Sequence, residues 1–296
     1  MFKVIAENIN VMSKKIGGAM KDRQPKPIQE MAEKLAANGA DYLDINLGPA
    51  RKGGEELMEW VVKTVQEVAD KPLYLDTSNV KAIEAGLKVH KSSAGKPVVN
   101  SISARPERME ALLPLAKEYD AGFVALVLGT EGIPRDENER AANAAMLMAQ
   151  ADELGFAPED VWIDPIVVPV SSQQQQVKSV TMFMQMMPEM APGYSSTCGL
   201  SNVSNGSPEK LRPLLNQCYL LMLKKAGLTG AILDGLDTEI IELSRGSRPD
   251  LEKVIGEVMD GNPPDVNALG EVERNFAKTT HVLQNERLYS DSWLDL

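Results

Sequence analysis

Residues 73–79 read Leu-Tyr-Leu-Asp-Thr-Ser-Asn, a short apolar run that ends in a carboxylate and is followed by an amide. A run of this length and composition is typical of a buried strand, and a helical spacing of apolar residues begins at Val80. Asn79 could cap that helix, because its side chain accepts hydrogen bonds from the free N–H groups of a first turn. The stretch therefore predicts a strand, a turn and a helix, with Asp76 at the carboxyl end of the strand.

The same unit recurs along the chain. Strands are expected near 2–6, 41–46, 72–76, 97–101, 122–128, 160–164, 196–201 and 230–233. Helices are expected near 25–38, 54–69, 79–89, 106–118, 136–154, 173–187, 207–226 and 237–245. Eight such units close a (β/α)8 barrel, the TIM-barrel fold of class α/β. An open doubly wound sheet gives the same alternation, but no Gly-x-Gly-x-x-Gly follows the first strand, so we favour the barrel.

We expect one domain over residues 1–296. The segment 246–270 departs from the alternation, because turn-forming Gly and Pro residues bracket a short helix, Asp250–Met259. We interpret it as a C-terminal helical insertion ahead of a final long helix, 267–289.

Polar side chains stand at the carboxyl ends of several expected strands. They are Asp44, Asn46, Asp76, Asn100, Asp164 and Asn202. In a parallel barrel these ends meet at one mouth, where active sites lie. This mouth is rich in carboxylates and amides and poor in His and Lys. It suits a flat, neutral heterocycle whose N–H groups donate to ionised Asp and to Asn, and it does not suit a phosphate or a metal.

Composition excludes several other classes of function. The chain has a net charge of −11, and binding to nucleic acid or to an anionic membrane surface needs clustered Lys and Arg. No apolar run is long enough to span a bilayer. The two cysteines, Cys198 and Cys218, are typical of reduced thiols, and no signal peptide precedes the first strand, so we expect a cytoplasmic protein.

The scarcity of histidine narrows the chemistry further. His90 and His281 are the only two, and both fall in helical stretches away from the expected strand ends. A zinc site or a Ser-His-Asp triad needs ligands or partners that this chain lacks at the mouth. Cys198 lies near the mouth, but without a partnering His it is interpreted as a small buried hydrophobe. We therefore expect no bound metal.

At this point the chain resembles the methyltetrahydrofolate–corrinoid protein methyltransferases, which include the corrinoid/iron–sulfur protein methyltransferases and the second methyltransferases of O-demethylase systems. The similarity runs from Ile5 to about Asp237 and resumes in the last helix. The motifs that carry it are Leu43-Asp44-Ile45-Asn46-Leu47-Gly48-Pro49, Leu75-Asp76-Thr77-Ser78-Asn79, Asn100-Ser101, Gly132-Ile133-Pro134, Ile163-Asp164-Pro165 and Gly199-Leu200-Ser201-Asn202-Val203-Ser204.

The resemblance implies a pterin-binding TIM barrel. It implies that Asp76, Asn100 and Asp164 hold the pterin ring and that Asn202, the expected catalytic residue, lies near N5, the atom that carries the methyl group. The residues expected to contact the pterin or folate also include Asp44, Asn46, Glu7, Ser201, Gly199 and Arg212. The substrate would be tetrahydrofolate or methyltetrahydrofolate, in one-carbon metabolism of a demethylase or acetogenic type.

The resemblance also implies a partner. A corrinoid, or cobalamin, is expected to arrive on a separate corrinoid-binding protein, because neither histidine lies in an Asp-x-His-x-x-Gly signature. The methyltransferase itself is expected to be a homodimer. Two alternatives stay open: a dihydropteroate synthase-like pterin enzyme, and a non-catalytic folate-binding subunit of a corrinoid complex. The first normally has basic residues where this chain has Gly199-Leu200-Ser201-Asn202 and Leu233-Asp234-Gly235.

Overall fold

Strands and helices alternate along residues 1–295, the part of the chain that this computed structural model describes. The strands are β1 (Lys3–Asn10), β2 (Tyr42–Gly48), β3 (Leu73–Thr77), β4 (Val98–Ser103), β5 (Gly122–Leu126), β6 (Val161–Asp164), β7 (Ser195–Ser196) and β8 (Gly230–Leu233). The helices are α1 (Lys14–Lys21), α2 (Pro25–Ala37), α3 (Gly54–Gln66), α4 (Val80–Val89), α5 (Pro106–Glu118), α6 (Glu137–Glu153), α7 (Val170–Met190), α8 (Arg212–Lys225), α9 (Thr238–Ser244), α10 (Pro249–Met259) and α11 (Glu271–Leu283).

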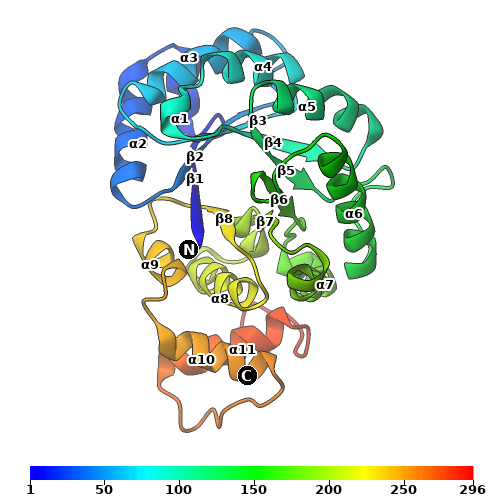
Figure 1. Cartoon of the computed structure of the whole chain (residues 1–296). Helices are drawn as coiled ribbons and strands as arrows, with labels where there is room; N and C mark the ends of the chain where they lie inside the picture. Colours follow the sequence, from blue (N-terminus) through cyan, green and yellow to red (C-terminus); the bar gives the residue numbers. More distant parts are fainter. Residues whose placement is uncertain (296) are drawn as a thin grey trace.

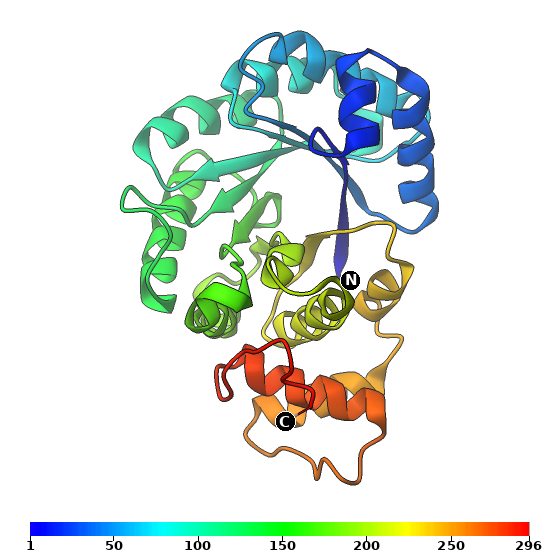
Figure 2. The same cartoon turned by 180° about the vertical axis from the view of Figure 1, so that it is seen from behind.

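The strands form one parallel sheet in the order β7-β6-β5-β4-β3-β2-β1-β8. Its two edges meet just beyond β7, where Gly199 and Ile232 form a parallel bridge and Ile232 N donates to Cys198 O at 2.8 Å. The result is a nearly closed barrel with helices around its outside (Figure 1; Figure 2). The predicted (β/α)8 barrel is confirmed, and the open doubly wound sheet is wrong.

The barrel interior is filled from the amino ends of the strands by an apolar floor. Six buried side chains form it, with Tyr42 packed against them: Ile5, Tyr74, Val98, Val124, Trp162 and Ile232. The rings of Tyr42, Tyr74 and Trp162 meet edge to face, with centroids 5.3 to 6.0 Å apart. Side chains alternate across a strand, so the residue two positions after each floor residue also faces the interior, one layer nearer the mouth.

Helix caps follow the sequence closely. Asn79 Oδ1 accepts from the N–H groups of Lys81 and Ala82 and starts α4, as predicted. Asp136 caps α6 in the same way. These caps fix where each helix leaves the turn after its strand, and therefore they fix the rim of the mouth.

Two elements at the start of the chain differ from prediction. The first strand is longer than 2–6 and reaches Asn10, and helix α1, which follows it, was not expected. Gly17 and Gly18 disfavour a helix by propensity. The structure gives a reason for Gly17: a Cβ there would lie 2.0 Å from Val11 O, so only glycine lets α1 approach the end of β1.

The seventh unit also differs. The predicted strand 196–201 is wrong: β7 is only Ser195–Ser196, and Leu200–Ser204 form a 3-10 helix instead. Ser204 Oγ donates to Ser201 O within this turn, an example of short polar side chains competing with a strand ladder. Asn202 therefore lies in a 3-10 helix after the strand and not at its end. The helix expected at 207–226 begins later, at Arg212, after Pro208 and a second 3-10 turn.

The last two helices form an outer layer. α10 and α11 pack on each other and on α8, below the barrel in Figure 1. The expected helix Asp250–Met259 is α10. The final helix is shorter than 267–289, because Gly270 precedes it and Asn285 ends it with a φ of 57°.

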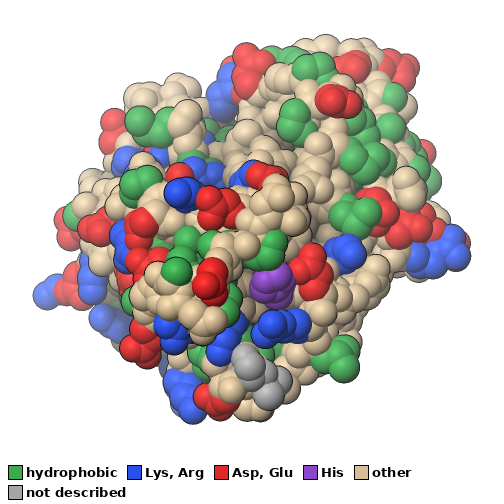
Figure 3. Space-filling view, turned by 90° about the horizontal axis from the view of Figure 1, so that it is seen from below, with side chains coloured by type: hydrophobic (Ala, Val, Ile, Leu, Met, Phe, Trp, Pro, Cys, Tyr) green, Lys and Arg blue, Asp and Glu red, His purple; other side chains and the backbone are tan. Residues whose placement is uncertain are grey.

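On the face shown in Figure 3, acidic, basic and apolar side chains are interspersed. That segment 246–270 is an insertion into one domain stays a prediction.

Candidate functional site

A layer of polar side chains lies directly above the apolar floor; we call it the polar ring. Its members stand two positions after floor residues on β1, β2, β3, β4, β6 and β8, and Asn46 extends it on β2. They are Glu7, Asp44, Asn46, Asp76, Asn100, Asp164 and Asp234. β5 has Leu126 at the corresponding position, and the short β7 contributes to neither layer. The alternation of the barrel strands therefore assembles the residues that the sequence predicted at separate strand ends.

One side of the polar ring is a row of amides and acids across three strands. Asn46 pairs in register with Asp76, and Asp76 pairs with Asn100. Asn46 Nδ2 donates to Asp76 Oδ2, and Asn100 Nδ2 donates to Asp44 Oδ1 at 3.0 Å. Each amide holds one acid, so the carboxylates of Asp44 and Asp76 are oriented before any ligand arrives.

Asp164 stands apart on β6, where it is buried. Its Oδ1 accepts from Ile166 N at 2.8 Å, and Ile166 has a φ of 66°. A β-branched residue in the left-handed region is strained, so the hydrogen bond to Asp164 helps to hold this turn.

The first and last strands bring an acidic pair to the ring. Ser201 Oγ donates to Glu7 Oε1 at 3.0 Å, which joins the segment after β7 to β1. Asn8 Nδ2 donates to Asp234 Oδ1 at 2.6 Å and joins β1 to the end of β8. Asp234 was not among the residues expected to contact a ligand, although its position directly after an apolar strand is the signal that marked Asp76.

Asn202 lies beside Gly199. A Cβ on Gly199 would be 2.9 Å from Asn202 Nδ2, so the glycine leaves room for the amide. Asn205 Nδ2 donates to Asn202 Oδ1 at 3.2 Å. Arg212 contacts this loop through Ser204 Oγ at 3.2 Å and Asn205 Oδ1 at 3.4 Å. Asn202, Gly199, Ser201 and Arg212 are thus gathered in and around one loop, and their roles toward a ligand stay predictions.

Burial disfavours the ionised form of the acids in the polar ring. It raises the pKa of Asp76 and of Asp164 to about 7. It raises the pKa of Asp44 well above the ordinary value, and the charge of Asp76 adds to that rise. Burial also raises the pKa of Glu7. With pKa values near 7, Asp76 and Asp164 are only partly ionised at neutral pH without a ligand, and a ligand that donates N–H groups to them would favour the charged form.

A cavity of about 320 Å³ opens beside Asp76 and Asn100. Arg105 and Arg108, two residues that the sequence analysis did not single out, line its far side. Arg108 donates to the carbonyl oxygens of Ser78 and Ser101, and Arg105 to that of Gly129. These guanidinium groups stiffen the rim by binding the backbone of β4 and of the turns after β3 and β5.

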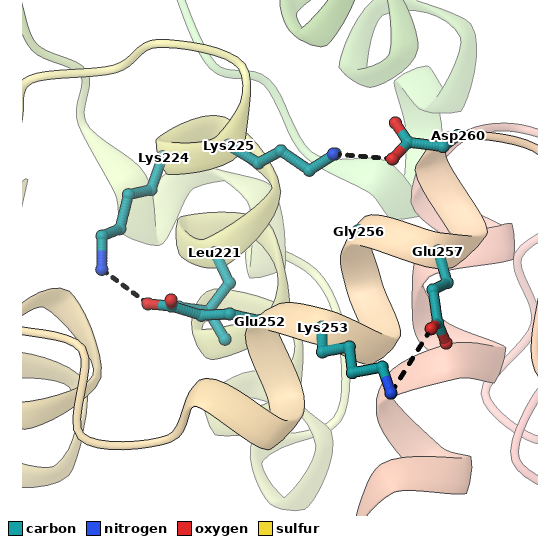
Figure 4. A pocket seen from close by; sticks show the side chains of 8 residues that line it. All are labelled: Leu221, Lys224, Lys225, Glu252, Lys253, Gly256, Glu257 and Asp260. Carbon is teal, nitrogen blue, oxygen red and sulfur yellow. Dashed lines mark hydrogen bonds and ion pairs between the residues drawn. The ribbon is translucent and has the colours of Figure 1, made fainter.

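Other features of the described residues give less support for a functional site. A larger cavity, about 440 Å³, lies between α8 and α10, where Lys224, Lys225 and Lys253 each pair with an acid (Figure 4). Its charges are balanced within the fold. In residues 1–295 no three His, Cys, Asp or Glu side chains are grouped as a metal ion requires. Nor does that part of the chain contain a helix that is long and apolar enough to cross a membrane.

The mouth of this parallel barrel carries acids that accept hydrogen bonds from an amide, a hydroxyl or a backbone N–H group, an arrangement that suits a flat ring with N–H donors. The family of pterin-binding enzymes matches residues 7–238, so the chain belongs to that family.

Individual relatives agree with this assignment. The chain is 27% identical over 233 residues to a methylcorrinoid:tetrahydrofolate methyltransferase of Eubacterium limosum, a match that covers 78% of this chain and 84% of the relative. This finding confirms the resemblance stated above. The chain is also 24% identical over 285 residues to the methionine synthase of Mycobacterium tuberculosis; the match covers 92% of this chain but only 23% of that much longer protein.

Solved structures show the same fold at lower identity. A dihydropteroate synthase of Xanthomonas albilineans superposes with a TM-score of 0.61 at 16% identity, covering 84% of this chain and 92% of that one. A dihydropteroate synthase of Coxiella burnetii gives a TM-score of 0.61 at 14% identity, with 83% and 93% covered. At this identity the likeness concerns the barrel alone.

Proposed function

We propose that this protein is a methyltransferase that moves a methyl group between N5 of tetrahydrofolate and the cobalt of a corrinoid carried by a partner protein. The observation that carries the proposal is the combination of a polar ring of acids and amides with an Asn202 amide on the loop beside it. The similarity to the methylcorrinoid:tetrahydrofolate methyltransferase supports it.

The polar ring supplies what a pterin needs. The aminopyrimidinone edge of a pterin presents N–H donors, and Asp76 and Asp164 supply carboxylate acceptors. Asn100 can both donate and accept, although its Nδ2 already binds Asp44. Because the acids are oriented in advance, little conformational entropy is lost when the ring binds.

Asn202 supplies the group that acts at N5. N5 of methyltetrahydrofolate is a tertiary amine and a poor leaving group, so methyl transfer requires it to gain positive charge or a stronger hydrogen bond. An amide donor at N5 strengthens its bond as the methyl group leaves. The nucleophilic cobalt is the chemistry of the corrinoid substrate, and this chain contributes orientation and electrostatics.

A dihydropteroate synthase-like activity is disfavoured by charge at the end of β8. There Asp234 carries a carboxylate close to the half-buried Glu7, where release of pyrophosphate calls for basic groups. A non-catalytic folate-binding subunit would need the polar ring but not Asn202. The two possibilities therefore separate on whether methyl transfer occurs.

The finer features belong to the same proposal. The partner is a corrinoid-binding protein, the methyltransferase is a cytoplasmic homodimer without a bound metal, and it works in a demethylase or acetogenic one-carbon pathway. Transfer in either direction passes through the same transition state, and either direction fits the site.

Two measurements test the proposal. Calorimetric titration with methyltetrahydrofolate in the presence of a chelator should show tight, metal-free binding. Single-turnover mixing with free cobalt(I) cobalamin should then produce methylcobalamin. Binding without transfer would support the non-catalytic subunit, and loss of binding with chelator would contradict the metal-free site. Gly199→Ala is an informative variant, because its Cβ would displace the Asn202 amide and should slow transfer while leaving the ring acids in place.

A further inference from the structure

Arg140 on α6 is an arginine with no exposed surface, the largest fully buried side chain among the described residues. Its guanidinium donates to five oxygen atoms, and none of them belongs to a carboxylate. The acceptors are Pro165 O at 2.9 Å, Pro134 O at 3.5 Å, Asp136 O at 3.2 Å, Ser179 Oγ at 3.0 Å and Gln176 Oε1 at 2.8 Å.

This arrangement is expensive in free energy. A charge taken out of water loses several kcal/mol of solvation. No carboxylate pairs directly with this guanidinium: Glu137 reaches it only through Ser179, whose Oγ accepts from Arg140 and donates to Glu137 Oε2 at 3.2 Å. A well-packed apolar side chain of similar size often gives equal or better stability at such a position. Stability alone therefore does not explain why an arginine stands at position 140, and its hydrogen-bond partners indicate another role.

The five acceptors come from three separate segments of the rim. Pro134 and Asp136 belong to the loop between β5 and α6, Pro165 follows β6 directly, and Gln176 and Ser179 lie on α7. Gln176 Nε2 also donates to Arg135 O at 2.6 Å and closes the network. One guanidinium thus ties the loop after β5 and the turn after β6 to helix α7.

The bond to Pro165 bears directly on Asp164. Asp164 is buried in the polar ring and uses Oδ1 to hold Ile166 N, while Ile166 keeps a φ of 66°. The strained turn Asp164-Pro165-Ile166 is therefore bound at its middle carbonyl by Arg140 and at its end by the carboxylate itself. Loss of the Arg140 bond would let the turn relax and would move the carboxylate out of place.

We propose that Arg140 is a positioning residue for the pterin site, acting on the ligand only through Asp164. The inference rests on the proposed function, because it assumes that Asp164 accepts a hydrogen bond from the pteridine ring. Displacement of an acceptor by about 1 Å can remove most of its value to binding, so the effect should be large for a residue that touches no ligand.

A double-mutant cycle tests this role. Arg140→Met should weaken binding of tetrahydrofolate at least about tenfold, and the same change in an Asp164→Asn background should weaken it little further. In an Asp76→Asn background, where β3 makes no contact with Arg140, the effect of Arg140→Met should stay complete. Arg140→Lys keeps the charge but loses the fork of donors, and should restore only part of the affinity.

Two further variants and one control protect the test against misfolding. Gln176→Met and Ser179→Ala each remove one acceptor from Arg140 and should give smaller losses of the same kind, suppressed again by Asp164→Asn. The control is Arg274→Gln on α11, because Arg274 likewise donates to backbone carbonyls, those of Val266 and Leu269, but lies outside the barrel. It should lower the melting temperature and leave the dissociation constant unchanged.

The outcomes are separable. If the wild-type protein binds no reduced pteridine, the proposed function fails. Suppose instead that the wild type binds, and that the loss of affinity from Arg140→Met, or from Gln176→Met and Ser179→Ala, simply adds to the loss from Asp164→Asn. The proposed function then stands and the role of Arg140 is overturned. Suppression by Asp164→Asn but not by Asp76→Asn supports it, since a purely structural arginine would show no preference between the two aspartates.

Discussion

The apolar floor and the polar ring occupy the same inward-facing side of the same strands, two residues or about 6.6 Å apart. In the floor, Tyr74 and Trp162 are buried and pack edge to face. In the ring, Asp76 and Asp164 follow them at matched positions, and burial raises the pKa of both to about 7. Burial of the floor side chains lowers the free energy of the folded protein, whereas burial of the ring carboxyls raises it. The difference indicates that the floor stabilises the barrel; under the proposed function, the ring one layer nearer the mouth binds the ligand.

The largest expected effect comes from the floor. Trp162→Ala removes a buried ring that packs on Tyr42 and Tyr74, and should lower the free energy of unfolding by about 3–5 kcal/mol. Urea denaturation measures it, with Trp162→Phe as a milder control. A loss well below this range would mean that the floor does not carry the stability assigned to it.

Asn202→Ala should leave the floor and the fold untouched and act on the rate. Loss of one preorganised donor at the reacting atom costs roughly 10²–10³ in rate, with a smaller effect on affinity because the bond strengthens only in the transition state. Single-turnover methyl transfer to cobalt(I) cobalamin, in both directions, measures it beside a melting curve. A normal rate in a less stable protein would show that Asn202 only holds the loop around Asn205.

Asp76→Ala and Asp164→Ala should weaken folate binding by about 1–3 kcal/mol each, because ligand donors are left without acceptors in a buried site. Asn79→Ala is a matched control just beyond the same strand as Asp76. It removes the cap of α4 and should cost about 1 kcal/mol of stability while the dissociation constant stays the same. If an aspartate variant behaves like the cap variant, that aspartate is structural.

The barrel and much of its ring could be predicted because their signal is local. Apolar runs such as 73–75 and 161–163 mark strands, and the acid that follows each run marks the mouth. Glu7 and Asp234 carry the same signal more weakly. β1 continues through the polar residues Glu7, Asn8 and Asn10, which an apolar strand pattern would not include, because this end of the strand lies at the polar mouth of the barrel.

Other features depend on specific contacts that the apolar pattern of the sequence does not encode. Helix α1 can lie against the end of β1 only because Gly17 has no Cβ to clash with Val11 O. The 3-10 turn around Asn202 replaces a strand because short polar side chains bind their own backbone. Arg140 stands in the stretch Arg-Ala-Ala-Asn-Ala-Ala, where an arginine normally marks the exposed face of a helix. Its burial follows from carbonyl groups that three other segments deliver.

The acids of the polar ring should also give a pair of opposite pH trends. A raised folded-state pKa means that the folded protein binds more protons than the unfolded chain between about pH 4 and 7, so stability should fall as pH rises through that window. Binding should show the reverse trend, because a ligand that donates N–H groups favours ionised Asp164 and releases its proton. The affinity should therefore rise with pH, by up to about tenfold per pH unit.

Asp164→Asn should flatten both trends and raise stability above pH 7, and Trp162→Phe should change neither slope. Urea unfolding at several pH values measures the first trend, and calorimetry in buffers of different ionisation enthalpy counts the protons released in the second. If binding releases no protons while stability still falls with pH, the ring acids stay protonated in the complex and act as donors, and the comparison between floor and ring would hold only for stability.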